Sequence, residues 1–156
     1  MIEITYQMVL STLQTIALIV GIYYYVMVLR NQQRSRKTQM FMPIYSRVLD
    51  SEYRRHFSDI RVWEWEDFDD WEKKYYENRD EWAKLVNVVM VLEWVSVLLK
   101  RKDIDFDIVY DTLRIEVTRL WDGIGPIIKE GRVRWDFPEF GAGVETLYNE
   151  LKKHEK

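Results

Sequence analysis

The pattern of apolar positions begins with one long run. Residues 4–29 carry no charged side chain, and residues 9–29 are almost entirely apolar. A helix needs roughly 20 apolar residues to cross the hydrocarbon core of a bilayer, so this run predicts a transmembrane helix. A signal peptide fits less well, because the run lacks a basic start and a small-residue cleavage site and has three tyrosines, residues 23–25, near its end. We therefore expect an uncleaved anchor.

Charges on either side of this run predict its orientation. Glu3 is the only charged side chain before it, whereas four basic residues follow closely: Arg30, Arg34, Arg36 and Lys37. The positive-inside rule then places the amino terminus outside and the rest of the chain in the cytoplasm. The basic residues could instead bind anionic lipid headgroups, although fixing the topology is the favoured role. We expect an anchor with a basic juxtamembrane segment over residues 1–37 and a cytoplasmic domain over residues 38–156.

One face of the predicted span combines small and polar side chains. Gln14, Ala17 and Gly21 recur at helical spacing. Ala17 and Gly21 form a small-xxx-small pair that allows a second helix to approach closely, and Gln14 could hydrogen-bond across the contact. The alternative is a stripe that faces lipid and has no helical partner.

The remaining apolar residues recur every three or four positions, which predicts an all-α domain of four or five helices. Pro43 is expected to interrupt the anchor helix, and Gly123 to Pro126 to end a later one. Residues 137–141 read as a loop. The predicted helices cover residues 44–56, 68–82 and 85–99. The next one has Asp105 or Asp107 as its N-cap and runs to about Trp121, and a last one begins near residue 143.

Glu93 lies in the middle of residues 85–99, which are otherwise nearly all apolar. That segment predicts a central helix buried on most sides, too short at about 22 Å for a second membrane span. A carboxylate there must be paired, exposed or protonated, and an acid kept protonated by burial can serve in catalysis. We expect an ion pair with Arg114 or Arg119 on the following helix instead.

Composition removes several kinds of chemistry. The chain has no cysteine and 2 histidines, which leaves little for thiolate, zinc or Ser-His sites. Three aspartates at 103, 105 and 107 have the spacing of a calcium loop, but Ile108 and Arg114 stand where glycine and an acid are needed. The pairs Glu52–His56 and Glu150–His154 lack the spacing of carboxylate-bridged metal centres. We expect no metal site and no cofactor.

Charge and aromatic content suggest a binding role. The net charge of −3 gives no reason to expect nucleic acid as a partner, and acids outnumber bases after Lys37. Aromatic residues reach 15%, with 7 Trp and 10 Tyr, which suits either an interface or a rich core. The favoured interpretation is a membrane-tethered interaction module or small accessory subunit of a membrane complex. Its expected partners are lipids and another membrane protein or a second copy.

Two alternatives stay open. A carboxylate-dependent enzyme would place Glu93 in a helical pocket, and a headgroup sensor would act through Arg30 to Lys37. The interaction module instead predicts an exposed aromatic patch.

Several short motifs also resemble a family of small prokaryotic single-span membrane proteins known only as a domain of unknown function. The resemblance lies in these short runs of two to four residues: Glu93-Trp94, Leu98-Leu99, Ile104-Asp105, Val109-Tyr110-Asp111, Leu120-Trp121 before Pro126, and Leu29-Arg30-Asn31-Gln32. Asp122 departs from the family pattern, which often has a second aromatic residue there. The resemblance implies a single-span anchor with a helical domain, and it supplies no activity and no catalytic residue.

Overall fold

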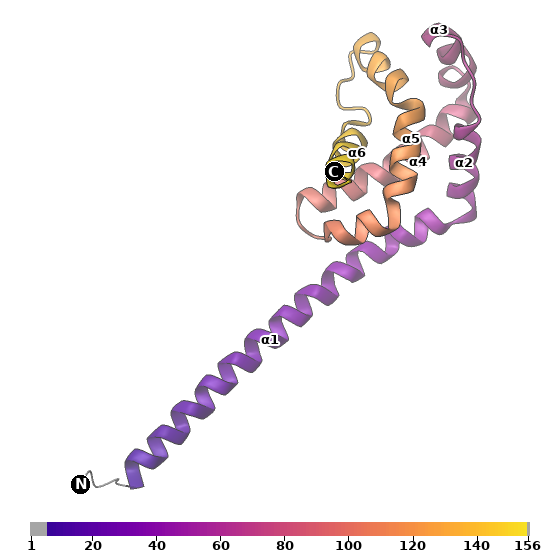
Figure 1. The fold of residues 1–156 in the computed structure, drawn as a ribbon. Helices are drawn as coiled ribbons and strands as arrows, with labels where there is room; N and C mark the ends of the chain where they lie inside the picture. The colour runs from indigo at the N-terminus through magenta and orange to yellow at the C-terminus, as the bar shows by residue number, and fades with distance from the viewer. Residues whose placement is uncertain (1–5, 156) are drawn as a thin grey trace. The chain divides into compact units, whose positions relative to one another are not determined.

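The computed structural model describes residues 6–155, which form an all-α protein as predicted (Figure 1). No strand occurs among these residues, and Glu3 lies outside them. The chain divides into two compact units, Met1–Gln39 and Met40–Lys156. The helices are α1 (Tyr6–Leu49), α2 (Ser51–Arg61), α3 (Phe68–Trp71), the π-helix η1 (Glu72–Tyr76), α4 (Arg79–Lys100), α5 (Phe106–Arg134) and α6 (Ala142–His154).

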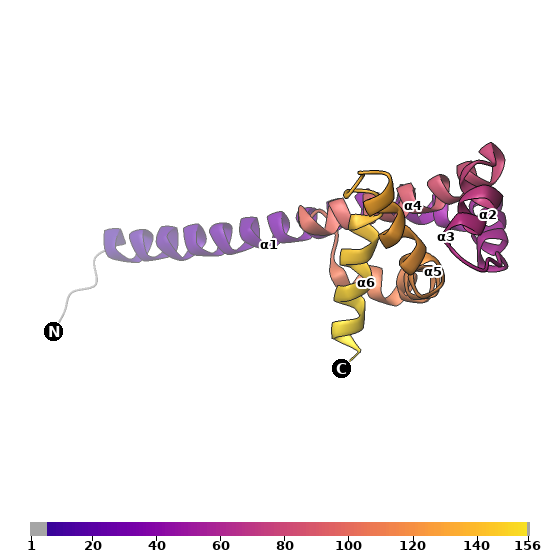
Figure 2. The ribbon, with the colours of Figure 1, turned by 90° about the horizontal axis from the view of Figure 1, so that it is seen from above.

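In the second unit, α4 occupies the centre of the helical packing. Helix α2 packs against α4, and α6 packs against both α4 and α5 (Figure 2). The short helices α3 and η1 lie between α2 and α4 in the chain, and both make contacts within the same unit. This arrangement gives α4 neighbours along much of its length, as its apolar sequence predicts.

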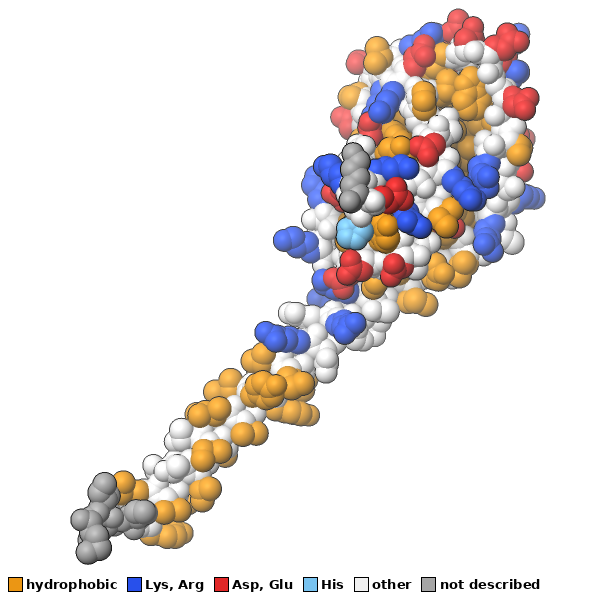
Figure 3. Space-filling model, viewed as in Figure 1, with side chains coloured by type: hydrophobic (Ala, Val, Ile, Leu, Met, Phe, Trp, Pro, Cys, Tyr) orange, Lys and Arg blue, Asp and Glu red, His pale blue; other side chains and the backbone are white. Residues whose placement is uncertain are grey.

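The described part of the first unit, from Tyr6, is the amino-terminal part of α1, and its apolar side chains are exposed (Figure 3). Leu18 and Tyr23, for example, are 65% and 67% exposed. Within the described residues, α1 and α4 are the two helices long and apolar enough to cross a membrane. A core helix of a soluble domain passes the same test, and α4 has buried core residues. The helices therefore indicate a membrane-associated protein, with α1 as the clearer candidate for a membrane span.

Pro43 does not end the first helix. Helix α1 continues through it to Leu49, so the predicted interruption is wrong. A proline removes one backbone hydrogen bond, but Phe41 and Val48 on either side are buried, and such packing can hold a helix together. The true break is at Asp50, whose carboxylate accepts a hydrogen bond from the Glu52 N–H and caps α2.

The aromatic helix predicted over residues 68–82 is divided in the structure. Asp67 caps α3 by accepting from the Asp70 N–H, and η1 ends at Tyr76. Asn78 then accepts from the N–H groups of Asp80 and Glu81 and begins α4. Trp82 therefore belongs to α4, because an asparagine cap restarts the helix before it.

Helix α5 passes through the segment predicted to end it. It continues from Phe106 to Arg134 and passes through Gly123, Gly125 and Pro126, so the predicted end at residues 123–126 is wrong. Ile124, Ile127 and Ile128 are buried beside these breakers, and their packing favours continued helix. The loop over residues 137–141 and a final helix beginning near residue 143 are as predicted.

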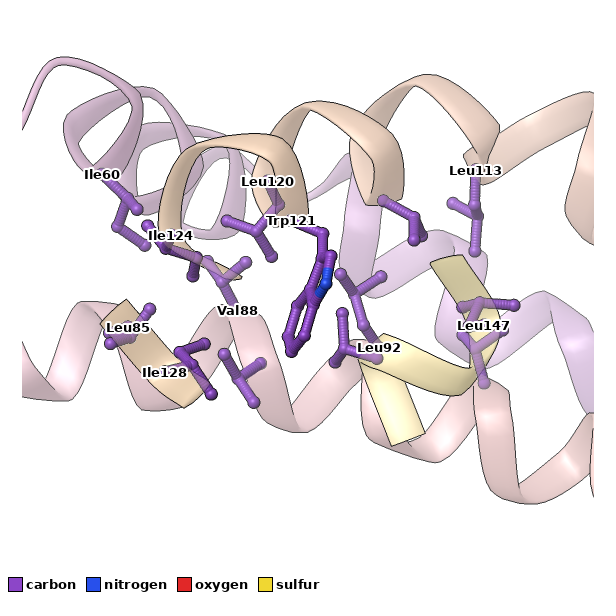
Figure 4. Close-up of a cluster of buried hydrophobic side chains, with 14 of the residues drawn as sticks. Ile60, Leu85, Val88, Leu92, Leu113, Leu120, Trp121, Ile124, Ile128 and Leu147 are labelled. Carbon is purple, nitrogen blue, oxygen red and sulfur yellow. The ribbon is translucent and has the colours of Figure 1, made fainter. Parts of the chain in front are cut away.

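The hydrophobic core lies between the helices of the second unit (Figure 4). Leu85, Val88 and Leu92 of α4 are fully buried, and they face a row of α5 side chains that includes Trp121. Fully burying one aliphatic side chain contributes about 1.5–3 kcal/mol, so this core is the main stabilising feature of the unit.

Candidate functional site

Glu93, the acid singled out from the sequence, caps a neighbouring helix. Its Oε1 accepts hydrogen bonds from the backbone N–H groups of Gly143 at 2.9 Å and Val144 at 3.1 Å, in the first turn of α6. A carboxylate is favoured there because the helix dipole leaves partial positive charge at an N-terminus. The predicted ion pair with Arg114 or Arg119 is wrong. Arg114 instead lies 3.5 Å from Glu155, and Arg119 has no ion-pair partner among the described residues.

The start of α6 is built to receive this carboxylate. Gly141 occupies the N-cap position with φ of +69°, a left-handed conformation that favours glycine, and it has no side chain to cap the helix. At Gly143 a Cβ atom would overlap Oε2 of Glu93. Glycine at residue 143 therefore lets the first turn of α6 approach α4 closely enough for the capping bonds to form.

An apolar hollow of about 290 Å³ opens beside Glu93. One wall is the outer face of α4, with Met90, Trp94 and Val97, and the other is the loop before α6, with Phe137 and Phe140. Trp94 is 56% exposed and Phe137 is 50% exposed. Large apolar groups held half in solvent around a hollow are typical of interaction surfaces. We call Met90, Trp94, Val97 and Phe137 the α4 surface.

Trp94 differs from the other tryptophans. All seven lie in the described range, and six of them pack against other aromatic rings of the fold. Trp71 and Trp135, for example, have ring centroids 6.0 Å apart, and the Trp135 indole N–H donates to Glu72 at 2.8 Å. Most of the aromatic richness therefore belongs to the core, and Trp94 is the tryptophan available at the surface.

Ionic contacts brace the loop that carries Phe137 and Phe140. Arg132 of α5 donates from Nε to the Phe140 carbonyl at 2.7 Å and also pairs with Glu145 of α6. Lys129 reaches the same carboxylate at 2.8 Å. Burial opposes ionisation of Glu145, but the hydrogen bonds and charges of the two bases outweigh it and lower the pKa of Glu145. The loop is thus tied to both α5 and α6.

The other predicted site residues belong to the first unit. Gln14, Ala17 and Gly21 are exposed on α1, and a Cβ at Gly21 would meet nothing within 4 Å. Arg30, Arg34 and Arg36 are exposed, and Lys37 is half-buried. These positions leave room for a helix or lipid to approach them.

The residues considered for metal binding have other neighbours. Glu52 pairs with Arg47 at 3.0 Å, the His154 ring packs edge-on against Tyr110, and Asp105 occupies the N-cap position of α5. Within residues 6–155 no group of three or more acidic or histidine side chains could hold a metal ion.

Three residues around Glu93 were not predicted from the sequence: Phe137, Phe140 and Gly143. The first two looked like loop residues, and their role depends on where the loop returns against α4. Gly143 had a local signal, because the Gly-Ala-Gly sequence at 141–143 permits close approach of another element at a helix start.

Comparison with known proteins gives one match. A family model described as a domain of unknown function, DUF4760, matches residues 11–151, which confirms the resemblance to such a family. No curated protein and no solved structure matches the chain.

Proposed function

We propose a function from the geometry alone, because the chain belongs to the DUF4760 family and the description of that family names no activity. The protein is a membrane-tethered interaction module, or a small accessory subunit of a membrane complex, that binds an apolar helix of a partner protein through its α4 surface. The observation that carries this proposal is the exposure of Trp94 and Phe137 beside the hollow.

The shape and chemistry of the α4 surface favour a helix as the partner. Met90, Trp94 and Val97 recur at helical spacing along α4 and form a stripe, and Phe137 borders the hollow beside them. Amphipathic helices bind such stripes by laying apolar side chains at the same spacing into the hollow. Trp is also among the residues that contribute most to binding at interface centres.

The proposed topology places this surface in the cytoplasm. Helix α1 spans the membrane once, with the amino terminus outside, and Arg30, Arg34, Arg36 and Lys37 lie at the cytoplasmic headgroups. In this arrangement Gln14, Ala17 and Gly21 provide a second contact with the partner, inside the bilayer. Capping of α6 by Glu93 favours this binding role over a catalytic acid, because the carboxylate is already engaged.

The test is native mass analysis of the full chain extracted in mild detergent. We expect a defined heteromeric complex that Trp94→Ala weakens about tenfold or more. Val133→Ala is the matched control, because Val133 is 81% exposed and does not line the hollow. A homo-oligomer that Gly21→Leu disrupts and Trp94→Ala leaves intact would contradict binding through the α4 surface. It would indicate self-association of α1 in the membrane instead. A monomer in every detergent would overturn the proposal.

A further inference from the structure

A second hollow in the domain has a different chemistry from the α4 surface. It measures about 340 Å³ and lies between the end of α1, α2 and α5. This volume lies within the range of small-ligand pockets, roughly 300–1,000 Å³. Its polar lining includes Tyr53, Arg54 and Arg61 from α2, with Glu116 and Arg119 from α5.

The three arginines give this hollow a positive charge. Arg54, Arg61 and Arg119 have no ion-pair partner among the residues the structure describes. Glu116 is the only acid in the lining, so the lining is net positive. Guanidinium groups match the oxygens of phosphate in a planar, two-pronged geometry, and a phosphate monoester carries about −1.5 to −2 charges at pH 7.

Tyr53 adds an unused hydrogen-bond donor. Its side chain is 1% exposed, and its hydroxyl is buried without a hydrogen-bond partner. Burial, with a smaller contribution from the charge of Glu116, raises the pKa of Tyr53 well above its usual range. The hydroxyl therefore stays protonated and can donate to an acceptor. Buried polar groups in proteins are nearly always hydrogen-bonded. The unpaired Tyr53 hydroxyl beside a cationic hollow therefore indicates that a ligand supplies the acceptor.

We propose that the hollow lined by Tyr53, Arg54, Arg61 and Arg119 is a binding site for a phosphate monoester group. The group belongs either to a soluble phosphorylated molecule or to a lipid headgroup. The arginines hold the phosphate oxygens, and the Tyr53 hydroxyl donates a hydrogen bond to one of them. This site is separate from the basic segment at residues 30–37 and does not depend on the α4 surface.

In the first experiment, inorganic phosphate is titrated into the full chain in mild detergent at constant ionic strength. The heat of binding is measured by calorimetry. We expect saturable binding that Arg54→Gln or Arg119→Gln weakens about tenfold or more. Arg55→Gln is the matched control, because Arg55 is the exposed neighbour of Arg54 and does not line the hollow. Equal effects of Arg54→Gln and Arg55→Gln, or no saturable binding, would overturn the proposal.

Two further variants keep the test decisive if an arginine variant folds poorly. Tyr53→Phe removes a hydroxyl that has no partner, so the thermal midpoint without phosphate should not fall, while phosphate affinity should. Glu116→Gln removes the only acid of the lining and should strengthen phosphate binding. Unchanged affinity in both variants would contradict the site.

A second arm identifies the source of the phosphate. The full chain is placed in nanodiscs of phosphatidylcholine with or without phosphatidic acid, whose headgroup is a phosphate monoester, and thermal unfolding is measured. Residues 30–37 also attract anionic lipid, so only the difference between Arg54→Gln and Arg55→Gln reports on the hollow. A midpoint raised by phosphatidic acid and lost in Arg54→Gln assigns the headgroup. Binding of inorganic phosphate without that shift assigns a soluble ligand.

Discussion

At the scale of single residues, the Glu93 carboxylate of α4 stabilises the start of another helix, α6. A helix that begins at glycine has no side chain to accept its first N–H groups, and a side-chain cap contributes about 0.5–2 kcal/mol. Glu93 supplies this acceptor to α6 from α4, at 2.9 and 3.1 Å. The carboxylate thus has hydrogen-bond partners although it lies in an apolar helix. The same two bonds fix the start of α6 against α4 and so hold the nearby loop in place.

This role predicts the behaviour of two Glu93 variants. Glu93→Ala should lower the free energy of unfolding by about 1–2 kcal/mol, because two N–H groups lose their acceptor. Glu93→Gln keeps an oxygen acceptor and loses the charge, so its loss should be smaller. Thermal unfolding of the full chain in mild detergent gives the order, and hydrogen exchange at Gly143 and Val144 should accelerate in Glu93→Ala.

The control for this prediction is Glu150→Ala, which removes an exposed acid from α6, the helix that Glu93 caps. Its unfolding and its exchange at Gly143 should match those of the natural chain. If Glu93→Ala also left exchange at Gly143 and Val144 unchanged, the capping role would be wrong.

At the scale of elements, the glycines of α5 show why a residue that ends helices elsewhere can occur inside one. A Cβ at Gly125 would lie 3.0 Å from the Trp121 ring, and a Cβ at Gly131 would lie 2.6 Å from the Trp135 ring. Each glycine is four residues from its tryptophan, so the indole lies along the helix surface where a side chain would be. These glycines accommodate tryptophans, and the helix continues past them.

The glycines of α5 therefore predict opposite effects of the same substitution. Gly123→Ala should raise the free energy of unfolding by about 0.5–1 kcal/mol, because alanine favours helix and a Cβ there meets nothing within 4 Å. Gly131→Ala should lower it, because the new Cβ displaces the Trp135 ring from its aromatic neighbours. Thermal unfolding of the two variants measures the contrast. A gain in both would mean that Trp135 moves without cost.

These elements also show how far the sequence predicts the structure. The apolar spacing in α4 and α6 predicts both helices, because each buries a regular face. Local breakers mislead at Pro43 and Pro126, since packing of distant residues outweighs one lost hydrogen bond. The partner of Glu93 was missed for a related reason. The sequence shows an acid in an apolar helix, but it does not show that a helix start 50 residues later in the chain lies beside that acid in space.

At the scale of the whole molecule, the burial of α4 decides whether this helix is a second membrane span. Both α1 and α4 are long and apolar enough to do so. If α4 spanned a bilayer, Glu93 and its bonds to α6 would lie at mid-span, where charged groups are costly. Burial of Leu85, Val88 and Leu92 against α5 instead gives α4 a protein environment. We therefore place α4 inside the helical domain that follows α1, which the proposed topology puts in the cytoplasm.

This placement predicts the labelling of single cysteines, which the chain permits because it has no natural cysteine. Ser58→Cys and Val133→Cys lie before and after α4, and both positions are exposed. A membrane-impermeant maleimide should leave both unlabelled in intact cells and label both after lysis, whereas Tyr6→Cys should be labelled in intact cells. If α4 crossed the membrane, Ser58→Cys and Val133→Cys would be on opposite sides, and only one would be protected. Labelling of both in intact cells, with Tyr6→Cys protected, would instead reverse the orientation and put the α4 surface outside the cell.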